Sequence, residues 1–126
     1  MISPIFVCHG GPTLVVENNE YTEFLKDRGK KLNPKAVVIF TAHWETGVTE
    51  ISSIEDTYDI IYDFSGFPQE LYSIKYPAKG SKEAASQLQA MLRNKGIESR
   101  LDGSRGLDHG AWEGRYFGNR KRFDCP

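Results

Sequence analysis

Apolar residues gather in four short runs that predict strands. Residues 4–8 and 36–41 are continuous apolar stretches rich in β-branched side chains, the pattern of strands buried on both faces. Residues 48–54 alternate loosely between apolar and polar, and residues 97–101 follow a glycine. We therefore expect two central strands and two further short ones.

Two longer segments carry apolar residues at helical spacing. The apolar positions of residues 19–31 recur among charged residues until Asn33-Pro34 closes the segment. In residues 81–95 the apolar positions fall on one helical face, and Gly96 follows as a C-terminal cap signal. The order strand, helix, strand at the start of the chain is a βαβ pattern. The sequence predicts an α/β domain with a mostly parallel central sheet flanked by helices.

Three segments lack this periodicity. Residues 58–77 are rich in aromatic and turn residues, which is typical of a pocket wall or lid, although the aromatics would also suit a satellite core. Residues 106–112 form a glycine-bounded loop. From Glu113 onward the chain is polar and highly charged, so we expect residues 113–126 to be a solvated tail.

Composition limits the class of protein. The 126 residues are 39% hydrophobic and 26% charged, the proportions of one globular domain. A formal net charge of -1 argues against nucleic acid or an anionic membrane as a partner. The apolar runs are far shorter than the roughly 18 residues of a membrane span, and the N-terminus lacks a signal-peptide pattern. With only two cysteines, the chain is expected to be cytoplasmic.

All three histidines stand beside glycines or at the ends of predicted strands. His9 and His43 follow the strands predicted at 4–8 and 36–41, and His109 lies in the glycine-bounded loop. In a parallel sheet the ligand site forms outside the C-terminal ends of the strands, so His9 and His43 are expected to converge. Neutral imidazoles suit Zn or Fe(II), and two histidines with a carboxylate are used for oxygen chemistry on non-haem iron.

Each of these residues also has a plain structural interpretation. A histidine taken alone is more often a structural or surface residue than a ligand. Cys8 is expected to be an inert core residue of the first strand, and Trp44 and Trp112 suit packing anchors. Asp108 fits an Asx turn. From the residues alone, the sequence supports an α/β domain with a candidate two-histidine metal site.

Five motifs in order carry a family resemblance. They are His9-Gly10-Gly11-Pro12, Thr41-Ala42-His43-Trp44-Glu45, Ile61-Tyr62-Asp63-Phe64-Ser65-Gly66-Phe67-Pro68, Ile74-Lys75-Tyr76-Pro77-Ala78 and Gly106-Leu107-Asp108-His109-Gly110-Ala111-Trp112. The set resembles the DOPA-dioxygenase branch of the class III extradiol ring-cleavage dioxygenases, within the LigB-like superfamily. The resemblance covers residues 4–112, roughly the N-terminal half of a usual member.

The resemblance implies a function and a set of site residues. It implies an oxidoreductase that binds one metal ion, Fe(II) or Zn(II), and opens a catechol ring such as that of DOPA with dioxygen. By motif match, His9 and His43 are implied as metal ligands and His109 as a catalytic residue near substrate and oxygen. The residues implied to lie at the substrate are Asp63, Phe64 and Trp112.

The chain also departs from the family pattern. The family's third protein ligand and a further catalytic histidine lie in the second half of the fold, whereas no histidine follows His109 here. Residues 1–112 are thus predicted to be the N-terminal part of the catalytic domain and 113–126 a tail outside the family, with the fold incomplete at its C-terminal end. We expect weak metal binding, poor activity and self-association through uncovered apolar strands. The alternatives are a non-catalytic LigB-like protein-binding module or an inactive fragment.

Overall fold

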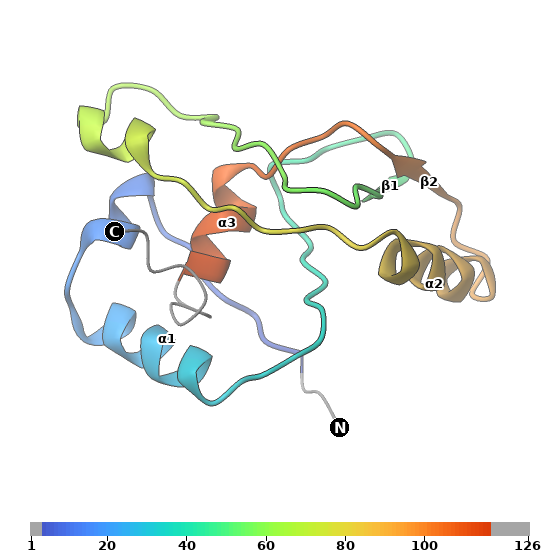
Figure 1. Cartoon of the computed structure of the whole chain (residues 1–126), viewed down its shortest axis with the longest axis horizontal. Helices are drawn as coiled ribbons and strands as arrows, with labels where there is room; N and C mark the ends of the chain where they lie inside the picture. Colours follow the sequence, from blue (N-terminus) through green and yellow to red (C-terminus); the bar gives the residue numbers. More distant parts are fainter. Residues whose placement is uncertain (1–3, 117–126) are drawn as a thin grey trace.

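The computed structural model describes the backbone of residues 4–116 and the side chains of residues 4–113. Its elements lie around a short C-terminal helix near the middle of the molecule (Figure 1). In chain order they are η1 (Pro12–Val16), α1 (Glu20–Lys30), β1 (Thr49–Ser52), η2 (Gln69–Ser73), α2 (Lys82–Arg93), β2 (Ser99–Asp102) and α3 (His109–Tyr116).

The helix predicted at residues 19–31 is confirmed as α1. Asn19 caps its start: the Asn19 side chain accepts a hydrogen bond from the Thr22 amide at 3.0 Å, and the Thr22 hydroxyl accepts from the Asn19 amide at 3.0 Å. This reciprocal capping box satisfies backbone donors that the first helical turn leaves unpaired. Acidic residues in the first turn and basic residues in the last also complement the helix dipole.

The helix predicted at residues 81–95 is confirmed as α2. The Ser81 hydroxyl accepts a hydrogen bond from the Ala84 amide at 3.1 Å and begins the helix. Gly96 follows its end at φ 73°, a left-handed backbone conformation that favours glycine. The helix packs against β1 and β2 (Figure 1), with Ala85 buried.

The sheet consists of a parallel pair, β1 and β2. Ile51 lies opposite Leu101 in the register, and α2 lies in the connection between the two strands. A parallel pair requires such a crossover. The predicted α/β class with parallel pairing and flanking helices is confirmed. β1 is shorter than the predicted range 48–54, and β2 begins and ends later than the predicted range 97–101.

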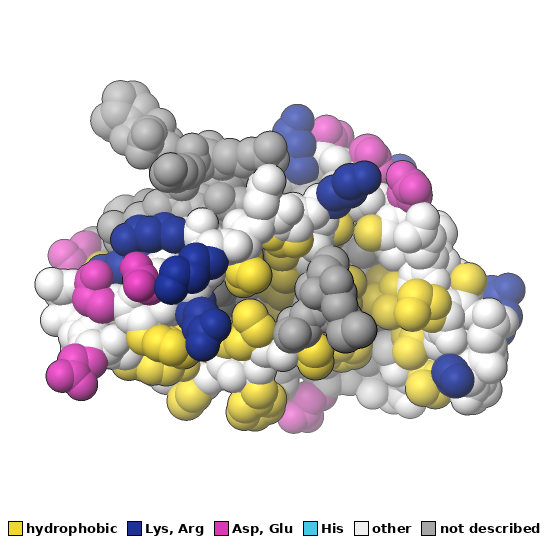
Figure 2. All heavy atoms as spheres, turned by 90° about the horizontal axis from the view of Figure 1, so that it is seen from below, with side chains coloured by type: hydrophobic (Ala, Val, Ile, Leu, Met, Phe, Trp, Pro, Cys, Tyr) yellow, Lys and Arg dark blue, Asp and Glu magenta, His cyan; other side chains and the backbone are white. Residues whose placement is uncertain are grey.

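The strands predicted at residues 4–8 and 36–41 are wrong for this structure. Both segments are extended, but within residues 4–116 no neighbouring strand pairs with them. Phe6 is 100% exposed and Phe40 80% exposed. Hydrophobic side chains gather on the face of the molecule that Figure 2 shows. An apolar run indicates that a segment tends to be buried. It becomes a strand only when a second segment from elsewhere in the chain pairs with it through backbone hydrogen bonds.

Three further expectations are corrected. Cys8 is exposed and free rather than part of a core strand, because its segment is unpaired. Residues 109–112 belong to α3 rather than to a loop, and Glu113 is buried in that helix with 1% exposure rather than starting a solvated tail. Residues 117–126 of the predicted tail lie outside the described residues. In the part of the chain that the structure describes, no helix is long and apolar enough to cross a membrane.

The core joins η1, the aromatic segment and α3. Its buried members are Leu14, Val15, Leu71, Tyr76, Ala78 and Trp112. Residues 59–61 pair with Leu107: the Ile61 amide donates to the Leu107 carbonyl, and the Leu107 amide donates to the Asp59 carbonyl, each at 2.8 Å. This pairing brings the aromatic segment beside the start of α3, and so brings Asp63 to His109.

Candidate metal centre

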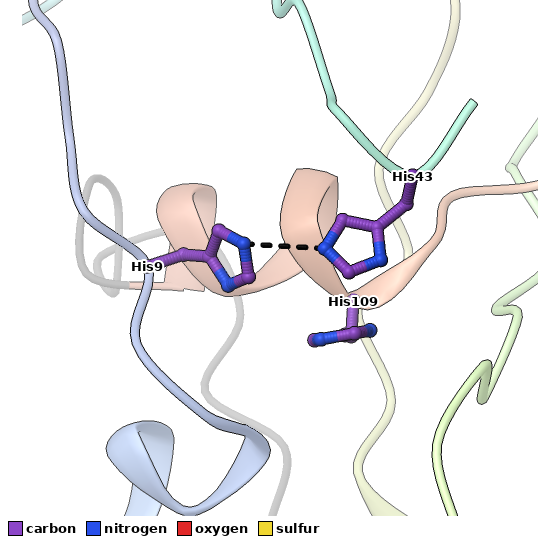
Figure 3. A group of neighbouring side chains, drawn as sticks. All are labelled: His9, His43 and His109. Carbon is purple, nitrogen blue, oxygen red and sulfur yellow. Dashed lines mark hydrogen bonds between the residues drawn. The ribbon is translucent and has the colours of Figure 1, made fainter. Parts of the chain in front are cut away.

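The three histidines meet at one point although they come from distant parts of the chain (Figure 3). The Nε2 atoms of His9 and His43 are 3.2 Å apart, and the ring centroids of His43 and His109 are 4.1 Å apart. One ring nitrogen from each histidine lies within 4.8 Å of the other two. The convergence expected for His9 and His43 is therefore present, and His109 joins it.

Each histidine is held by a different local structure. His9 ends the first extended segment, two residues before Gly11 begins the turn into η1, and His109 opens α3. His43 is tied to α3 through Thr41, whose hydroxyl accepts from the His43 amide at 3.2 Å and donates to Asp108 at 2.8 Å. Asp108 also accepts from the Ala111 amide at 3.0 Å, which satisfies a free donor at the start of the helix.

The close approach of His43 to α3 requires a glycine. A Cβ atom at Gly110 would lie 2.6 Å from Cδ2 of His43 and 3.0 Å from Oγ1 of Thr41. The first of these separations is shorter than van der Waals contact allows, so any side chain at this position would displace the imidazole.

A carboxyl group faces the Nδ1 atom of every histidine. Asp63 serves two of them, with Oδ2 at 3.1 Å from Nδ1 of His43 and Oδ1 at 2.8 Å from Nδ1 of His109. Oε2 of Glu113 lies 3.4 Å from Nδ1 of His9. A neutral imidazole that donates its Nδ1–H to a carboxylate keeps a lone pair on Nε2. The contacts of Asp63 therefore favour Nε2 lone pairs on His43 and His109.

Electrostatics reinforce the neutral form of His9. Burial lowers the pKa of the His9 imidazole, and the positive charges that His109 and His43 carry when protonated lower it further. Neutral imidazole is the form that binds a metal, because protonation removes the lone pair.

The pKa values of the Asp63 and Glu113 carboxyl groups shift in opposite directions. Partial burial raises the pKa of Asp63, but the hydrogen bonds from the amide and ring of His109 outweigh it, so the net pKa is below its ordinary value. Burial raises the pKa of Glu113 to about 8, and the negative charge of Asp63 adds to the increase. Asp63 is therefore the ionised acceptor of the pair near neutral pH.

The donor set fits a single transition-metal ion. Imidazole nitrogen is a ligand that suits Zn and Fe. Two nitrogens bound at about 2.1 Å in tetrahedral geometry lie about 3.4 Å apart, and the 3.2 Å separation of the His9 and His43 Nε2 atoms fits a shared ion.

The residues predicted to lie at the substrate occupy different environments. The Phe64 ring contacts the His109 ring edge-on, with centroids 5.5 Å apart, and Asp63 contacts two histidines directly. Trp112 has 0% exposure and belongs to the core cluster, as its packing interpretation anticipated. It leaves no ring surface open to a ligand.

Sequence reasoning missed Glu113 and the link from Asp63 to two histidines. Glu113 carries a recognisable signal, because it follows His109 by four residues and would share its helical face if the loop were a helix. The role of Asp63 depends on the pairing of residues 59–61 with Leu107, which is a contact between distant segments.

Comparison with known proteins finds a family model and several relatives that match most of the chain. The family model described as the catalytic LigB subunit of aromatic ring-opening dioxygenase matches residues 4–117. Over 112 residues the chain is 41% identical to the 4,5-DOPA dioxygenase extradiol of Beta vulgaris, covering 85% of this chain and 41% of the relative. Over 110 residues it is 42% identical to the Escherichia coli protein of the same name, covering 86% of this chain and 40% of the relative.

A fungal relative matches a similar share of the chain. The 4,5-DOPA dioxygenase extradiol-like protein of Schizosaccharomyces pombe is 33% identical over 132 residues, covering 89% of this chain and 44% of the relative. The chain thus spans about two fifths of the length of the curated relatives it matches.

Proposed function

Because this chain belongs to the LigB family of aromatic ring-opening dioxygenases, we propose that its histidine cluster binds one metal ion and serves extradiol cleavage of a catechol by dioxygen. The observation that carries the proposal is the convergence of one ring nitrogen each from His9, His43 and His109 within 4.8 Å. The family implies a metal ion, and the relatives named 4,5-DOPA dioxygenase extradiol support a DOPA-like catechol as substrate.

His9 and His43 bind the metal, and His109 accepts a proton from the substrate and returns it. When bound, the metal supplies a Lewis acid that lowers the pKa of the catechol hydroxyls and brings the diol and dioxygen together. Because dioxygen insertion needs a redox-active ion and Zn(II) has no redox chemistry, Fe(II) is the active metal and Zn(II) an inert substitute. Binding of His109 as a third ligand is the second candidate, favoured by its ring nitrogen lying within 4.8 Å of the other two.

The protein's own groups prepare His109 for proton transfer. Asp63 accepts the Nδ1–H of His109 at 2.8 Å and the His109 amide at 2.9 Å, so the ring is fixed with its Nε2 lone pair free. A free Nε2 beside the metal position accepts a proton from a substrate hydroxyl and returns it later, as a general acid–base group does near neutral pH. The Phe64 ring packs against His109 and limits water on that side.

The surface and charge of the chain bear on its partners and location. Exposed apolar side chains such as Phe6 and Phe40 support self-association of the chain. The near-neutral net charge supports a small molecule, rather than nucleic acid or a membrane, as the partner. The low cysteine content supports a cytoplasmic location. The non-catalytic binding module is not favoured, because the relatives are named as dioxygenases.

Metal loading followed by oxygen uptake tests the proposal. The purified 126-residue chain is loaded with Fe(II) without oxygen, its metal content is measured, and DOPA and air are then added. We expect one ion per chain, oxygen consumption, and a yellow ring-opened product formed more slowly than by a full-length relative. The double variant His9→Ala/His43→Ala is the control and should retain no ion. Equal retention by the control would contradict the metal site, whereas an ion bound without oxygen uptake would indicate an inactive fragment.

A further inference from the structure

A buried carboxyl group on α3 faces His9 and has no other partner among the residues that the structure describes. Glu113 has 1% exposure, and its Oε2 lies 3.4 Å from Nδ1 of His9. Within the described part of the chain, both Glu113 oxygens and the His9 Nδ1 are buried without a hydrogen-bond partner. Buried polar groups are nearly always paired. Oε2 of Glu113 and Nδ1 of His9 are close enough that a small reorientation of the two side chains brings them into hydrogen-bond geometry.

The position of Glu113 on α3 directs its side chain toward the histidines. Glu113 follows His109 by four residues, so both lie on the same face of α3, one turn apart. Trp112, the neighbouring residue, is fully buried in the core and anchors the helix. The close approach of His43 at Gly110 adds a second constraint from the other side. The Glu113 side chain therefore starts from a rigid element (Figure 3 shows the helix behind the three rings).

His9 lacks the support that the other two histidines receive. Asp63 gives one oxygen to the Nδ1 of His43, at 3.1 Å, and the other to the Nδ1 of His109, at 2.8 Å. Both carboxylate oxygens of Asp63 are directed at these two rings, and among the described residues no hydrogen bond joins Asp63 to His9. In metal sites, a carboxylate that accepts from the second nitrogen of a ligand histidine fixes its tautomer and orientation, and its loss typically costs about 10–100-fold in affinity.

We propose that Glu113 is the positioning residue for His9, accepting its Nδ1–H so that the Nε2 lone pair is directed at the shared metal position. This inference rests on the proposed metal function of the histidine cluster. A carboxyl group keeps an acceptor oxygen whether or not it is ionised, so the role does not depend on its charge. Glu113 acts through His9 and is not itself a ligand: the candidate ligand group found among the described residues comprises the three histidines.

Two variants of Glu113 separate an acceptor role from simple packing. Glu113→Gln keeps an acceptor oxygen and nearly the same volume, whereas Glu113→Met fills the space without any acceptor. Glu83→Met on the exposed surface of α2 is the matched control for the same chemical change. Zn(II) is the probe, and its affinity is measured in the full 126-residue chain by competition with a chromophoric chelator. Circular dichroism melts verify that each variant is folded.

A spectroscopic readout reports the tautomer directly. In ¹⁵N-histidine-labelled protein, NMR correlation spectra show which His9 nitrogen carries the proton, with Zn(II) bound and in the metal-free chain at about pH 9, where a carboxylate can only accept a hydrogen bond. We expect a proton on His9 Nδ1 in the wild type and in Glu113→Gln, protected from exchange. In Glu113→Met this protection is lost.

The expected affinities follow from the same reasoning. Zn(II) affinity falls about tenfold or more in Glu113→Met and stays within about threefold of the wild type in Glu113→Gln and Glu83→Met. Equal affinity and an unchanged His9 spectrum in Glu113→Met would overturn the inference. A wild type that binds no Zn(II) would instead overturn the proposed metal function, and the metal-free spectra would still decide whether Glu113 holds His9.

Discussion

Asp63 holds His109 by two hydrogen bonds at once: its Oδ1 accepts the His109 backbone amide at 2.9 Å and the ring Nδ1–H at 2.8 Å. One bond fixes where α3 begins and the other fixes the orientation of the ring. The other carboxylate oxygen of Asp63 reaches Nδ1 of His43 at 3.1 Å. A single side chain thus couples the start of a helix to the tautomers of two histidines.

Asp63→Asn should therefore weaken metal binding more than its small change in shape suggests. An amide offers one acceptor and one donor in place of two acceptors, so one of the two histidines must turn a bare Nδ1 toward it and carry its proton on Nε2. We expect Zn(II) affinity to fall by about 10–100-fold. Chelator competition measures it, with the exposed Asp59→Asn as control. A loss below about twofold would show that Asp63 does not set these tautomers.

His109→Gln distinguishes the two candidate roles of His109. If His109 moves a proton, the variant keeps one ion per chain with less than about tenfold loss of affinity, while ring opening falls by about 10²–10⁴-fold. If it is a ligand, metal content falls with activity, as expected for His9→Ala and His43→Ala. Metal analysis and oxygen uptake on the same preparations give the comparison. Unchanged metal content together with unchanged turnover would remove His109 from both roles.

How much of this arrangement could be predicted depends on whether its determinants are local. The helices α1 and α2 begin at Asn19 and Ser81, whose caps and apolar spacing stand in the sequence itself. The segment 36–41 has an equally clear pattern, but its pairing depends on another part of the chain, and no such partner occurs within residues 4–116. His9 and His43 could be placed together by strand-end reasoning even so, because both segments run toward the same point.

Glu113 shows the opposite case. Its charge and its position in a polar stretch pointed to solvent, since charged residues are rarely buried without a partner. Tertiary packing of Trp112 extends the helix one turn further and carries Glu113 inside. The sequence contained the four-residue spacing from His109, but not the information that residues 109–112 are helical.

Gly110→Ala should disturb His43 without disturbing the helix. Alanine favours a helix interior over glycine by about 1 kcal/mol, yet its Cβ would lie 2.6 Å from the His43 ring and force it to move. We expect about a tenfold loss of Zn(II) affinity, with α3 retained by circular dichroism. Gly47→Ala is the control, because nothing lies within 4 Å of a Cβ there. Equal affinity in both variants would mean that the ring accommodates the methyl group elsewhere.

Asp102 should make the loop after β2 sensitive to acid. Hydrogen bonds from the backbone amides of Arg105 and Ser104 lower the pKa of its carboxyl below the ordinary value. A group whose folded pKa is depressed contributes stability that is present above its ordinary pKa and is lost as the pH falls through the folded pKa. Melting temperatures measured from neutral pH down to about pH 3 should therefore fall less steeply in Asp102→Asn than in the wild type. Identical slopes would contradict this assignment.

The unpaired apolar segments should make the chain self-associate. Phe6 and Phe40 are 100% and 80% exposed, and covering apolar surface gains about 25 cal/mol per Å². We expect size-exclusion and light-scattering measurements to give an apparent mass that rises with concentration, and Phe6→Ser/Phe40→Ser to reduce that rise. Because exposed side chains contribute little to folding, the double variant should melt at nearly the wild-type temperature. Met91→Ser, at a residue 66% exposed on α2, is the matched control. If it reduces association as much as the double variant does, the contact involves another surface; if neither does, the extended segments are not where copies of the chain meet.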